Sequence, residues 1–271
     1  MGSETEGVFH IADVSSVTPG LLRATLRTPD GIRIEAVHEP HRGHRDSLTD
    51  TAVVVAHGFT GSVDRPAVRR AARAFRRRAA VVTFSFRGHG RSGGRSTVGD
   101  REVLDLAAAV SWARELGYTR VVTAGFSMGG SVVLRHGALY RDDPRARADA
   151  VAAVSAPARW YYRGTAPMRR LHWVVTRPAG RLVGRYGLRT RIHDRDWDPV
   201  PMPPFAAVPL IAPTPLLIVH GDRDPYFPLD HPRMLAAAGP CELWLEPGMG
   251  HAENAADDAL LARLADWLSA A

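Results

Sequence analysis

Short apolar runs alternate with longer amphipathic stretches through most of this sequence. The apolar runs occupy residues 52–57, 80–86, 120–125, 150–156, 215–220 and 241–246. Between them, apolar residues spaced three and four positions apart predict helices at residues 65–78, 100–116, 128–140, 229–238 and 255–268. Apolar strands separated by helices predict an α/β fold, with a mostly parallel sheet covered by helices on both faces.

The residues before the first apolar run follow a period of two instead. Residues 21–28 and 32–38 alternate between apolar and polar positions on either side of Pro29-Asp30-Gly31, a sequence that favours a tight turn. This pattern predicts an antiparallel β-hairpin at one edge of the sheet.

One long segment interrupts the alternation of strands and helices. Residues 158–213 contain three tryptophans, many prolines and little strand character. Within this segment, residues 159–191 hold nine arginines and no acidic residue. Insertions of such length in a compact domain are usually lids or binding elements. We therefore predict a single domain over residues 1–271, with a short, partly helical cap inserted at about residues 158–213.

The composition narrows the class of protein. The chain has 271 residues, 45% of them hydrophobic and 23% charged, which suits one folded domain with a substantial core. Its apolar runs are too short to span a bilayer, and its N-terminus has neither a basic start nor a continuous apolar segment. The single cysteine, Cys241, excludes an intrachain disulfide. We therefore expect a cytoplasmic protein with no transmembrane segment.

All of the positive charge is carried by one residue type. The 35 basic residues are all arginine, and the formal net charge is +7. A high positive charge can indicate nucleic-acid binding. Here, however, the arginines are mixed with acidic residues along most of the chain, and no nucleic-acid motif is present. We expect no nucleic-acid partner, and we attribute the absence of lysine to a codon bias.

The candidate chemistry centres on residues 121–137, where a β-branched run leads through Gly125-Phe126-Ser127-Met128-Gly129 into a helical pattern. A serine hydroxyl is a poor nucleophile at neutral pH and needs a neighbouring base, an orienting acid and donors for the oxyanion. A tight strand–serine–helix turn would project Ser127 above the sheet, and the Met128 N–H at the start of the helix would favour negative charge. The alternative is a structural turn in which Ser127 only caps the helix.

Further candidate groups follow other strands of the predicted sheet. His57-Gly58-Phe59 ends the run at 52–57, Asp222 and Asp224 follow the run at 215–220, and His251 lies between the last strand and the last helix. Loops beyond the carboxyl ends of parallel strands meet at one edge of the sheet, where such folds place their functional residues. The chain order Ser, Asp, His also fits a nucleophile–acid–base triad.

These motifs resemble those of the α/β-hydrolase superfamily. The resemblance extends from about residue 21 to the C-terminus and is weakest in the cap. It implies Ser127 as the nucleophile and His251 as the base. It also selects Asp224 rather than Asp222 as the acid, since in the family the acid stands three residues after the glycine at the end of this strand.

The same resemblance assigns the oxyanion hole and the reaction. It places the backbone N–H of Phe59 beside that of Met128 as the oxyanion donors. It implies a serine hydrolase that cleaves a carboxylic ester or thioester through an acyl-enzyme intermediate and needs no cofactor. The same triad would serve a carbon–carbon bond hydrolase, a lactonase or a perhydrolase, and a non-catalytic ligand-binding protein could use this scaffold. No cluster of histidine and cysteine residues predicts a metal site.

The cap would determine which small molecule is the substrate, and its residues have two interpretations. Trp160, Tyr161, Met168 and Trp173 either line an apolar acyl pocket or form a small core of the cap itself. The arginine excess either steers an anionic substrate or is a solvated face, and we favour the solvated face.

Overall fold

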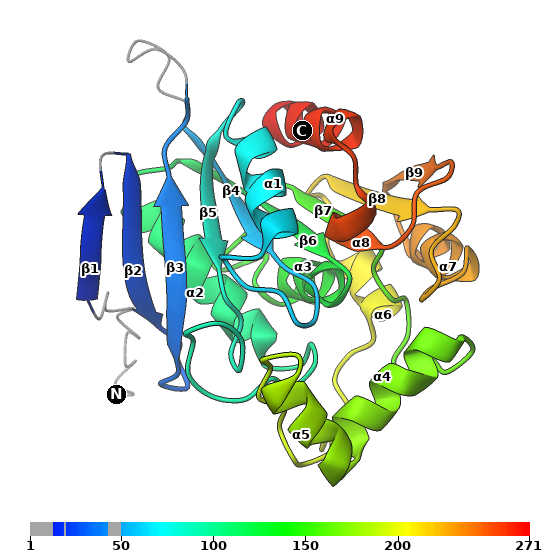
Figure 1. Ribbon diagram of the computed structural model, residues 1–271. Coiled ribbons are helices and arrows are strands. Elements are labelled where there is room, and N and C mark those ends of the chain that lie inside the picture. The colour runs from blue at the N-terminus through cyan, green and yellow to red at the C-terminus, as the bar shows by residue number, and fades with distance from the viewer. Residues whose placement is uncertain (1–12, 19, 43–49) are drawn as a thin grey trace, which may run out of the picture.

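The computed structural model describes residues 13–18, 20–42 and 50–271, whose strands form one sheet (Figure 1). Along the chain, the strands are β1 (Asp13–Thr18), β2 (Leu21–Arg27), β3 (Arg33–Glu39), β4 (Thr51–Ala56), β5 (Ala80–Phe84), β6 (Arg120–Phe126), β7 (Val151–Val154), β8 (Leu216–Gly221) and β9 (Glu242–Glu246). Across the sheet, their order is β1-β2-β3-β5-β4-β6-β7-β8-β9.

The sheet is parallel over most of its width and antiparallel at one edge. The strands from β5 to β9 across the sheet pair in parallel. In contrast, β1, β2 and β3 pair antiparallel with one another, and β3 pairs antiparallel with β5. The predicted fold class and the hairpin of β2 and β3 are therefore confirmed. The edge strand β1 was not predicted, because its sequence DVSSVT has only two apolar residues and no apolar run marks it.

Helices cover both faces of the sheet. Successive residues of a strand point to opposite faces, so a strand that is apolar throughout presents apolar side chains to both. The main covering helices are α1 (Pro66–Phe75), α2 (Glu102–Glu115), α3 (Met128–Leu139) and α9 (Asp258–Ala270). In β4, Val53 and Val55 face the core that α1 and α9 complete, whereas Ala52 and Val54 face the core beneath α2 and α3. Figure 1 shows α1 and α9 in front of the sheet and α2 behind it.

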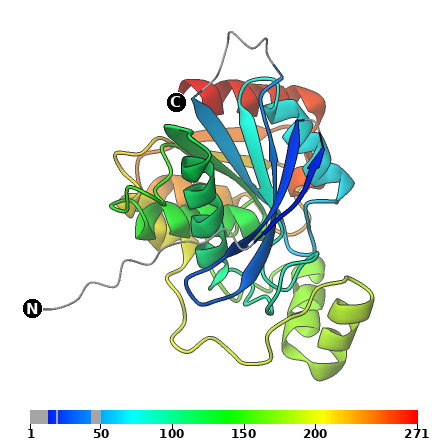
Figure 2. The same ribbon diagram turned by 90° about the vertical axis from the view of Figure 1, so that its left-hand side faces the viewer.

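Residues 158–213, here called the inserted segment, lie between β7 and β8. They include α4 (Ala166–Thr176), α5 (Pro178–Tyr186), α6 (Pro204–Ala207) and the 3-10 helix η1 (Val208–Leu210). Helices α4 and α5 form an angled pair that projects beyond the carboxyl ends of the parallel strands (Figures 1 and 2). The Arg191 N–H donates to the Gly88 carbonyl at 2.8 Å, and the Ser96 N–H donates to the Arg191 carbonyl at 2.7 Å. These bonds join the inserted segment to the loop after β5.

The C-terminal part of the chain contains α7 (Asp230–Ala238) and the single turn α8 (Ala252–Ala255). The turn α8 was not predicted. Helix α9 begins after Asp257, whose side chain accepts the Leu260 N–H at 2.8 Å and so caps the helix. Within the part of the chain that the structure describes, no helix is both long enough and apolar enough to cross a membrane.

Candidate active site

Ser127 occupies the sharp turn between β6 and α3. Its φ and ψ are 52° and −114°, a conformation that non-glycine residues rarely adopt. The flanking glycines are required for close packing: a Cβ on Gly125 would collide with the Gly129 carbonyl oxygen, and a Cβ on Gly129 would collide with the Ala56 carbonyl oxygen. The turn is therefore strained and depends on both glycines, as in a strand-to-helix turn that exposes a serine hydroxyl.

Ser127, His251 and Asp224 form a continuous hydrogen-bonded chain. Ser127 Oγ lies 2.8 Å from His251 Nε2, and His251 Nδ1 lies 2.7 Å from Asp224 Oδ2. The three side chains come from the loops after β6, β9 and β8, which parallel pairing brings to the same edge of the sheet. With Nδ1 donating to the carboxylate, Nε2 is left to accept the serine proton. The three residues predicted as a triad thus have the contacts needed to transfer that proton.

The surroundings of Asp224 keep it ionised. Burial raises the pKa of this carboxyl group, but the hydrogen bond from His251 and the N–H groups of Phe227 and Tyr226 outweigh burial and hold the pKa below its ordinary value. The carboxylate can therefore orient the imidazole and stabilise it when it becomes positively charged.

Asp222, the alternative acid, has a different position. Its Oδ1 accepts the Gly248 N–H at 2.6 Å. This bond fixes the turn that leads from β9 toward His251. Asp222 caps a turn and is not hydrogen-bonded to the imidazole.

The backbone N–H groups of Phe59 and Met128 lie in the two loops next to the serine. Met128 is the first residue of α3, so its N–H has no partner within the helix. Among the described residues, neither N–H donates a hydrogen bond within the protein. A Cβ placed on Gly58 would lie 3.4 Å from Ser127 Cβ, so the Phe59 loop passes directly beside the serine. Both N–H groups are therefore free to donate to a negative oxygen at this position.

Glu253 is a charged neighbour of this site that the sequence motifs did not single out. The residue is only 6% exposed, and its Oε1 accepts the Gly58 N–H at 3.0 Å. Its backbone carbonyl accepts a hydrogen bond from Arg70 Nη2 at 2.8 Å. Glu253 thus connects the loop of His251 with the loop of Phe59. The only sequence signal is an acidic residue two positions after the histidine.

Two buried histidines shape the loops around the serine. His57 Nδ1 lies 2.7 Å from the Gly58 carbonyl, and its Nε2 accepts the Phe86 N–H at 3.0 Å. His89 Nε2 accepts the Thr60 N–H at 3.3 Å. Burial lowers the pKa of His57 to about 3 and that of His89 to about 4, so both rings are neutral at physiological pH. Their hydrogen bonds hold the loops and leave His251 as the base nearest the serine.

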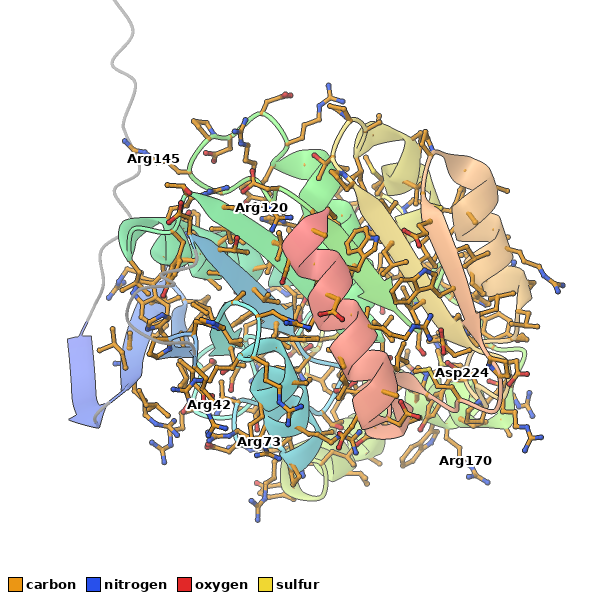
Figure 3. All side chains as sticks on the ribbon, turned by 90° about the horizontal axis from the view of Figure 1, so that it is seen from above. Arg42, Arg73, Arg120, Arg145, Arg170 and Asp224 are labelled. Atoms are coloured by element: carbon orange, nitrogen blue, oxygen red, sulfur yellow. The ribbon has the colours of Figure 1, made fainter. Side chains whose placement is uncertain are left out.

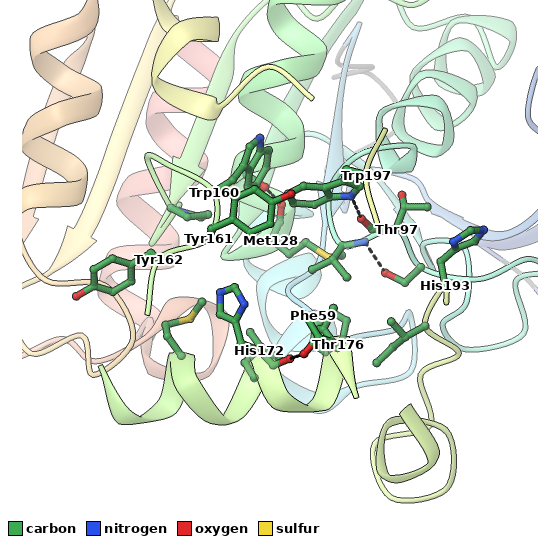
Figure 4. Close-up of a pocket in the computed structure, with 18 of the residues that line it drawn as sticks. Phe59, Thr97, Met128, Trp160, Tyr161, Tyr162, His172, Thr176, His193 and Trp197 are labelled. Carbon is green, nitrogen blue, oxygen red and sulfur yellow. Dashed lines mark hydrogen bonds between the residues drawn. The ribbon is translucent and has the colours of Figure 1, made fainter. Parts of the chain in front are cut away.

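A pocket opens between Ser127 and the inserted segment. Its volume is about 150 Å³, and most of its walls are aromatic or aliphatic side chains. Helix α4 forms one wall, and Figure 4 shows His172 directed from this helix toward Tyr161. The pocket is therefore shared between the sheet edge and the inserted segment.

The four residues expected to contact substrate separate into two groups. Trp160, Tyr161 and Met168 line the pocket. Trp173 does not, and it is 47% exposed. The residues of α4 that face the pocket follow a three- and four-residue spacing, and Trp173 falls outside this row. They are Met168, Leu171, His172, Val175 and Thr176. The prediction that Trp173 lines the pocket is therefore wrong, because its position on α4 lies outside the row of residues that face the pocket.

Comparison with protein-family models identifies the class to which this architecture belongs. The model of the alpha/beta hydrolase family matches residues 53–264. The chain belongs to the alpha/beta hydrolase family and is a hydrolase. A search of curated protein sequences gave no match.

Solved structures share the fold at low sequence identity. The esterase Pf2001 of Pyrococcus furiosus is 21% identical, with 95% of each chain covered and a TM-score of 0.71. Est1E from Butyrivibrio proteoclasticus, with ferulic acid bound, is 20% identical, with 89% of this chain and 94% of that chain covered and a TM-score of 0.61. The serine hydrolase XC6422 from Xanthomonas campestris, described as having no lid, is 20% identical, with 94% of each chain covered and a TM-score of 0.59.

Proposed function

We propose that this protein is a serine hydrolase that cleaves a carboxylic ester or thioester through an acyl-enzyme intermediate on Ser127. The observation that carries the proposal is the unbroken hydrogen-bonded chain from Ser127 Oγ through His251 to Asp224, with distances of 2.8 and 2.7 Å. The alternative of a helix-capping serine is disfavoured, because the Ser127 side chain makes no cap hydrogen bond to α3.

In the first half-reaction, Ser127 Oγ attacks the acyl carbon while His251 Nε2 accepts the hydroxyl proton. Negative charge develops on the acyl oxygen, where the N–H groups of Phe59 and Met128 stabilise it. One donor of this kind is typically worth about 3 kcal/mol of transition-state stabilisation. Asp224 keeps the other ring proton on Nδ1 and stabilises the imidazolium. His251 then protonates the leaving alkoxide or thiolate, and the acyl group remains on Ser127.

In the second half-reaction, water attacks the acyl carbon and gives a proton to His251 Nε2. The new tetrahedral oxyanion occupies the same pair of N–H donors. As it collapses, the carbon–Oγ bond breaks and His251 returns the proton to Ser127 Oγ. The carboxylic acid leaves, and the enzyme is restored without a cofactor.

We propose that the inserted segment acts as a cap on one domain and selects the acyl group, with Trp160, Tyr161 and Met168 in contact with it. An apolar cavity with a volume of about 150 Å³, like this pocket, can hold a molecule the size of benzene. This favours a compact apolar or aromatic acyl group on a small-molecule substrate. The ferulic acid bound to Est1E is an acid of that kind. The expectation of a cytoplasmic location stands on the composition alone.

The test is covalent labelling with a fluorophosphonate, followed by mapping of the adduct. We expect labelling at Ser127, and loss of both labelling and ester hydrolysis in Ser127→Ala. Ser269→Ala, which removes an exposed hydroxyl on α9, is the matched control and should react normally. An unlabelled Ser127 combined with unchanged hydrolysis in Ser127→Ala would contradict the proposal.

A substrate panel separates the bond types that this triad can cleave. Aryl and alkyl esters, matched thioesters and lactones are compared at a constant acyl group. We expect the highest kcat/KM for esters or thioesters of compact apolar acids. A preference for lactones, or for a substrate cleaved at a carbon–carbon bond, would reassign the reaction while keeping Ser127 as the nucleophile.

A further inference from the structure

Residues 159–191, which include α4 and α5, carry a concentrated positive charge. Residues 159–191 hold nine arginines and no acidic residue. Of these nine, Arg159 alone forms an ion pair with an acidic side chain of the described residues, with Asp230 at 2.8 Å. Arginines elsewhere are more often neutralised, as Arg87 is by Asp30 and Asp105, each at 2.7 Å. Eight of the nine arginines in residues 159–191 therefore form no ion pair with an acidic side chain of the described residues.

Large apolar side chains share this surface. Trp173, Leu182, Val183 and Tyr186 are 47%, 58%, 47% and 74% exposed. The two buried residues of α5, Gly180 and Gly184, face α4 and residues 190–192, so that Leu182 and Tyr186 lie on the opposite side of the helix. We call the set Arg170, Trp173, Arg177, Leu182, Val183, Arg185 and Tyr186 the α4–α5 outer surface.

This surface is also prominent in the shape of the molecule. The α4–α5 pair projects from the sheet in both Figure 1 and Figure 2. Seen from above in Figure 3, Arg170 extends at the periphery of the protein. A flat partner can therefore reach this surface without meeting the sheet and its covering helices.

We propose that the α4–α5 outer surface docks the protein onto an anionic lipid bilayer. Arginines at such a surface bind lipid phosphates, while tryptophan, tyrosine and leucine enter the boundary between headgroups and acyl chains. A nucleic acid would match the charge, but it would give no favourable contact to Leu182 or Val183. The pairing of unneutralised arginines with exposed aliphatic groups favours the bilayer.

Docking in this orientation places the pocket close to the bilayer. The opposite face of α4 supplies pocket residues such as Met168 and Val175. A helix is about 10 Å across, so the pocket would lie roughly one helix diameter from the lipid surface. An apolar substrate dissolved in the bilayer would then have a short route to the pocket. The docking itself does not depend on the proposed hydrolysis.

The test is partition onto large unilamellar vesicles, measured by co-sedimentation of the whole chain carrying Ser127→Ala. Vesicles of phosphatidylcholine with phosphatidylglycerol are compared with phosphatidylcholine alone. We expect binding to the anionic vesicles, and a loss of about 100-fold in the partition coefficient for the triple variant R170E/R177E/R185E. We expect a loss of about tenfold for L182S/Y186S, and this loss should persist at high salt.

The matched control is R73E/R145E/R233E, which changes the net charge equally at exposed arginines on other surfaces. We expect it to bind within about threefold of the parent. Equal losses in the two triple variants would show that only net charge matters and would overturn the proposal. Absence of binding to anionic vesicles would overturn it as well.

Heparin and single-stranded DNA are tested as competing polyanions. Binding to either that is as tight as binding to vesicles, with no effect of L182S/Y186S on any of them, would identify a general polyanion site and overturn bilayer docking. Failure of Ser127 labelling with intact vesicle binding would count only against the hydrolase proposal.

Discussion

The two walls of the pocket are built in opposite ways. On the sheet side, α3 begins at the strained Ser127 turn and has ten buried residues. On the other side, α4 has a single buried residue, Met168, and the only buried residues of α5 are two glycines. The sheet side is densely packed, whereas the α4–α5 pair has few buried residues.

This difference corresponds to a division of tasks. Proton transfer requires Ser127, His251 and Asp224 to stay within hydrogen-bond distance, and a densely packed scaffold provides that rigidity. Substrate choice requires a wall whose shape can change without disturbing the triad. Segments with few buried contacts open locally at low free-energy cost. We therefore expect substitutions on the sheet side to be severe and those on the inserted segment to redirect specificity.

The largest expected effect is a loss of kcat in Asp224→Asn, for which Asp222→Asn is the matched control. Both variants keep an oxygen that can accept the neighbouring backbone N–H groups, so the turns should persist. Asp224→Asn removes the charge that orients His251, and we expect kcat to fall by about 10⁴. Asp222→Asn should stay within about threefold, because Asp222 only caps a turn. Equal losses in steady-state assays would contradict the assignment of the acid.

The next effect concerns folding stability. In Gly129→Ala, the new Cβ would collide with the Ala56 carbonyl of β4, and we expect the free energy of unfolding to fall by at least about 3 kcal/mol. Gly187→Ala, just after α5, meets only the Val183 carbonyl at 3.0 Å and should change stability by less than about 1 kcal/mol. Urea unfolding followed by circular dichroism measures both. If Gly129→Ala left the free energy of unfolding unchanged, the contrast between the two walls would be wrong.

The same contrast explains which parts of the fold and of the site could be predicted from the sequence. The strands from β4 to β8 were recognisable because burial on both faces requires apolar runs, and the loops at their ends carried residue types with a defined chemistry. Ser127, Asp224 and His251 are far apart in the chain, yet parallel pairing leaves one edge where they can meet. Local patterns and topology were sufficient for these features.

The remaining features depend on geometry that no local pattern contains. Glu253 contacts Gly58 across 195 positions of sequence, through the path of two loops. Trp173 was assigned to the pocket from its residue type, but its phase on α4 turns it away from the row of pocket residues. Trp197 and Phe227, which do line the pocket, stand in irregular segments without a periodic signal.

The third prediction tests the link between these loops. Glu253→Ala removes the acceptor of the Gly58 N–H, so the neighbouring Phe59 N–H should lose its fixed position. We expect kcat to fall by about 10- to 100-fold with little change in KM. Glu253→Gln keeps an acceptor oxygen and should recover most of the activity. A loss of thermal stability with unchanged kcat would show that Glu253 has only a structural role.

The fourth prediction addresses the other wall. Met168→Ala enlarges the pocket, and we expect the preferred acyl group to become longer, with kcat/KM for the original best substrate falling by about tenfold. Leu182→Ala, on the outer surface, should leave the preference for soluble esters unchanged. An acyl-length series assayed with both variants makes the comparison. A shift of preference in Leu182→Ala would show that the outer surface communicates with the pocket.

The smallest expected effect is a pH dependence of folding stability caused by His136, which lies on the sheet side of the pocket. His136 in α3 is buried and stacks on Tyr140 with ring centroids 4.9 Å apart. Burial lowers its pKa from the ordinary value of 6.5 to about 3. Below pH 6.5, the unfolded chain therefore binds a proton that the folded chain does not, and the free energy of unfolding falls as the pH approaches 3.

His136→Phe keeps the stacked ring without the titration. We expect the slope of stability against pH to decrease by up to about 1.4 kcal/mol per pH unit over this window. His172→Phe in α4 is the comparison, since burial lowers the pKa of His172 less strongly and the slope should change less. Urea unfolding at a series of pH values measures both slopes. If the larger change occurs in His172→Phe, the inserted segment is more tightly packed than its few buried residues indicate, and the contrast between the two walls is wrong.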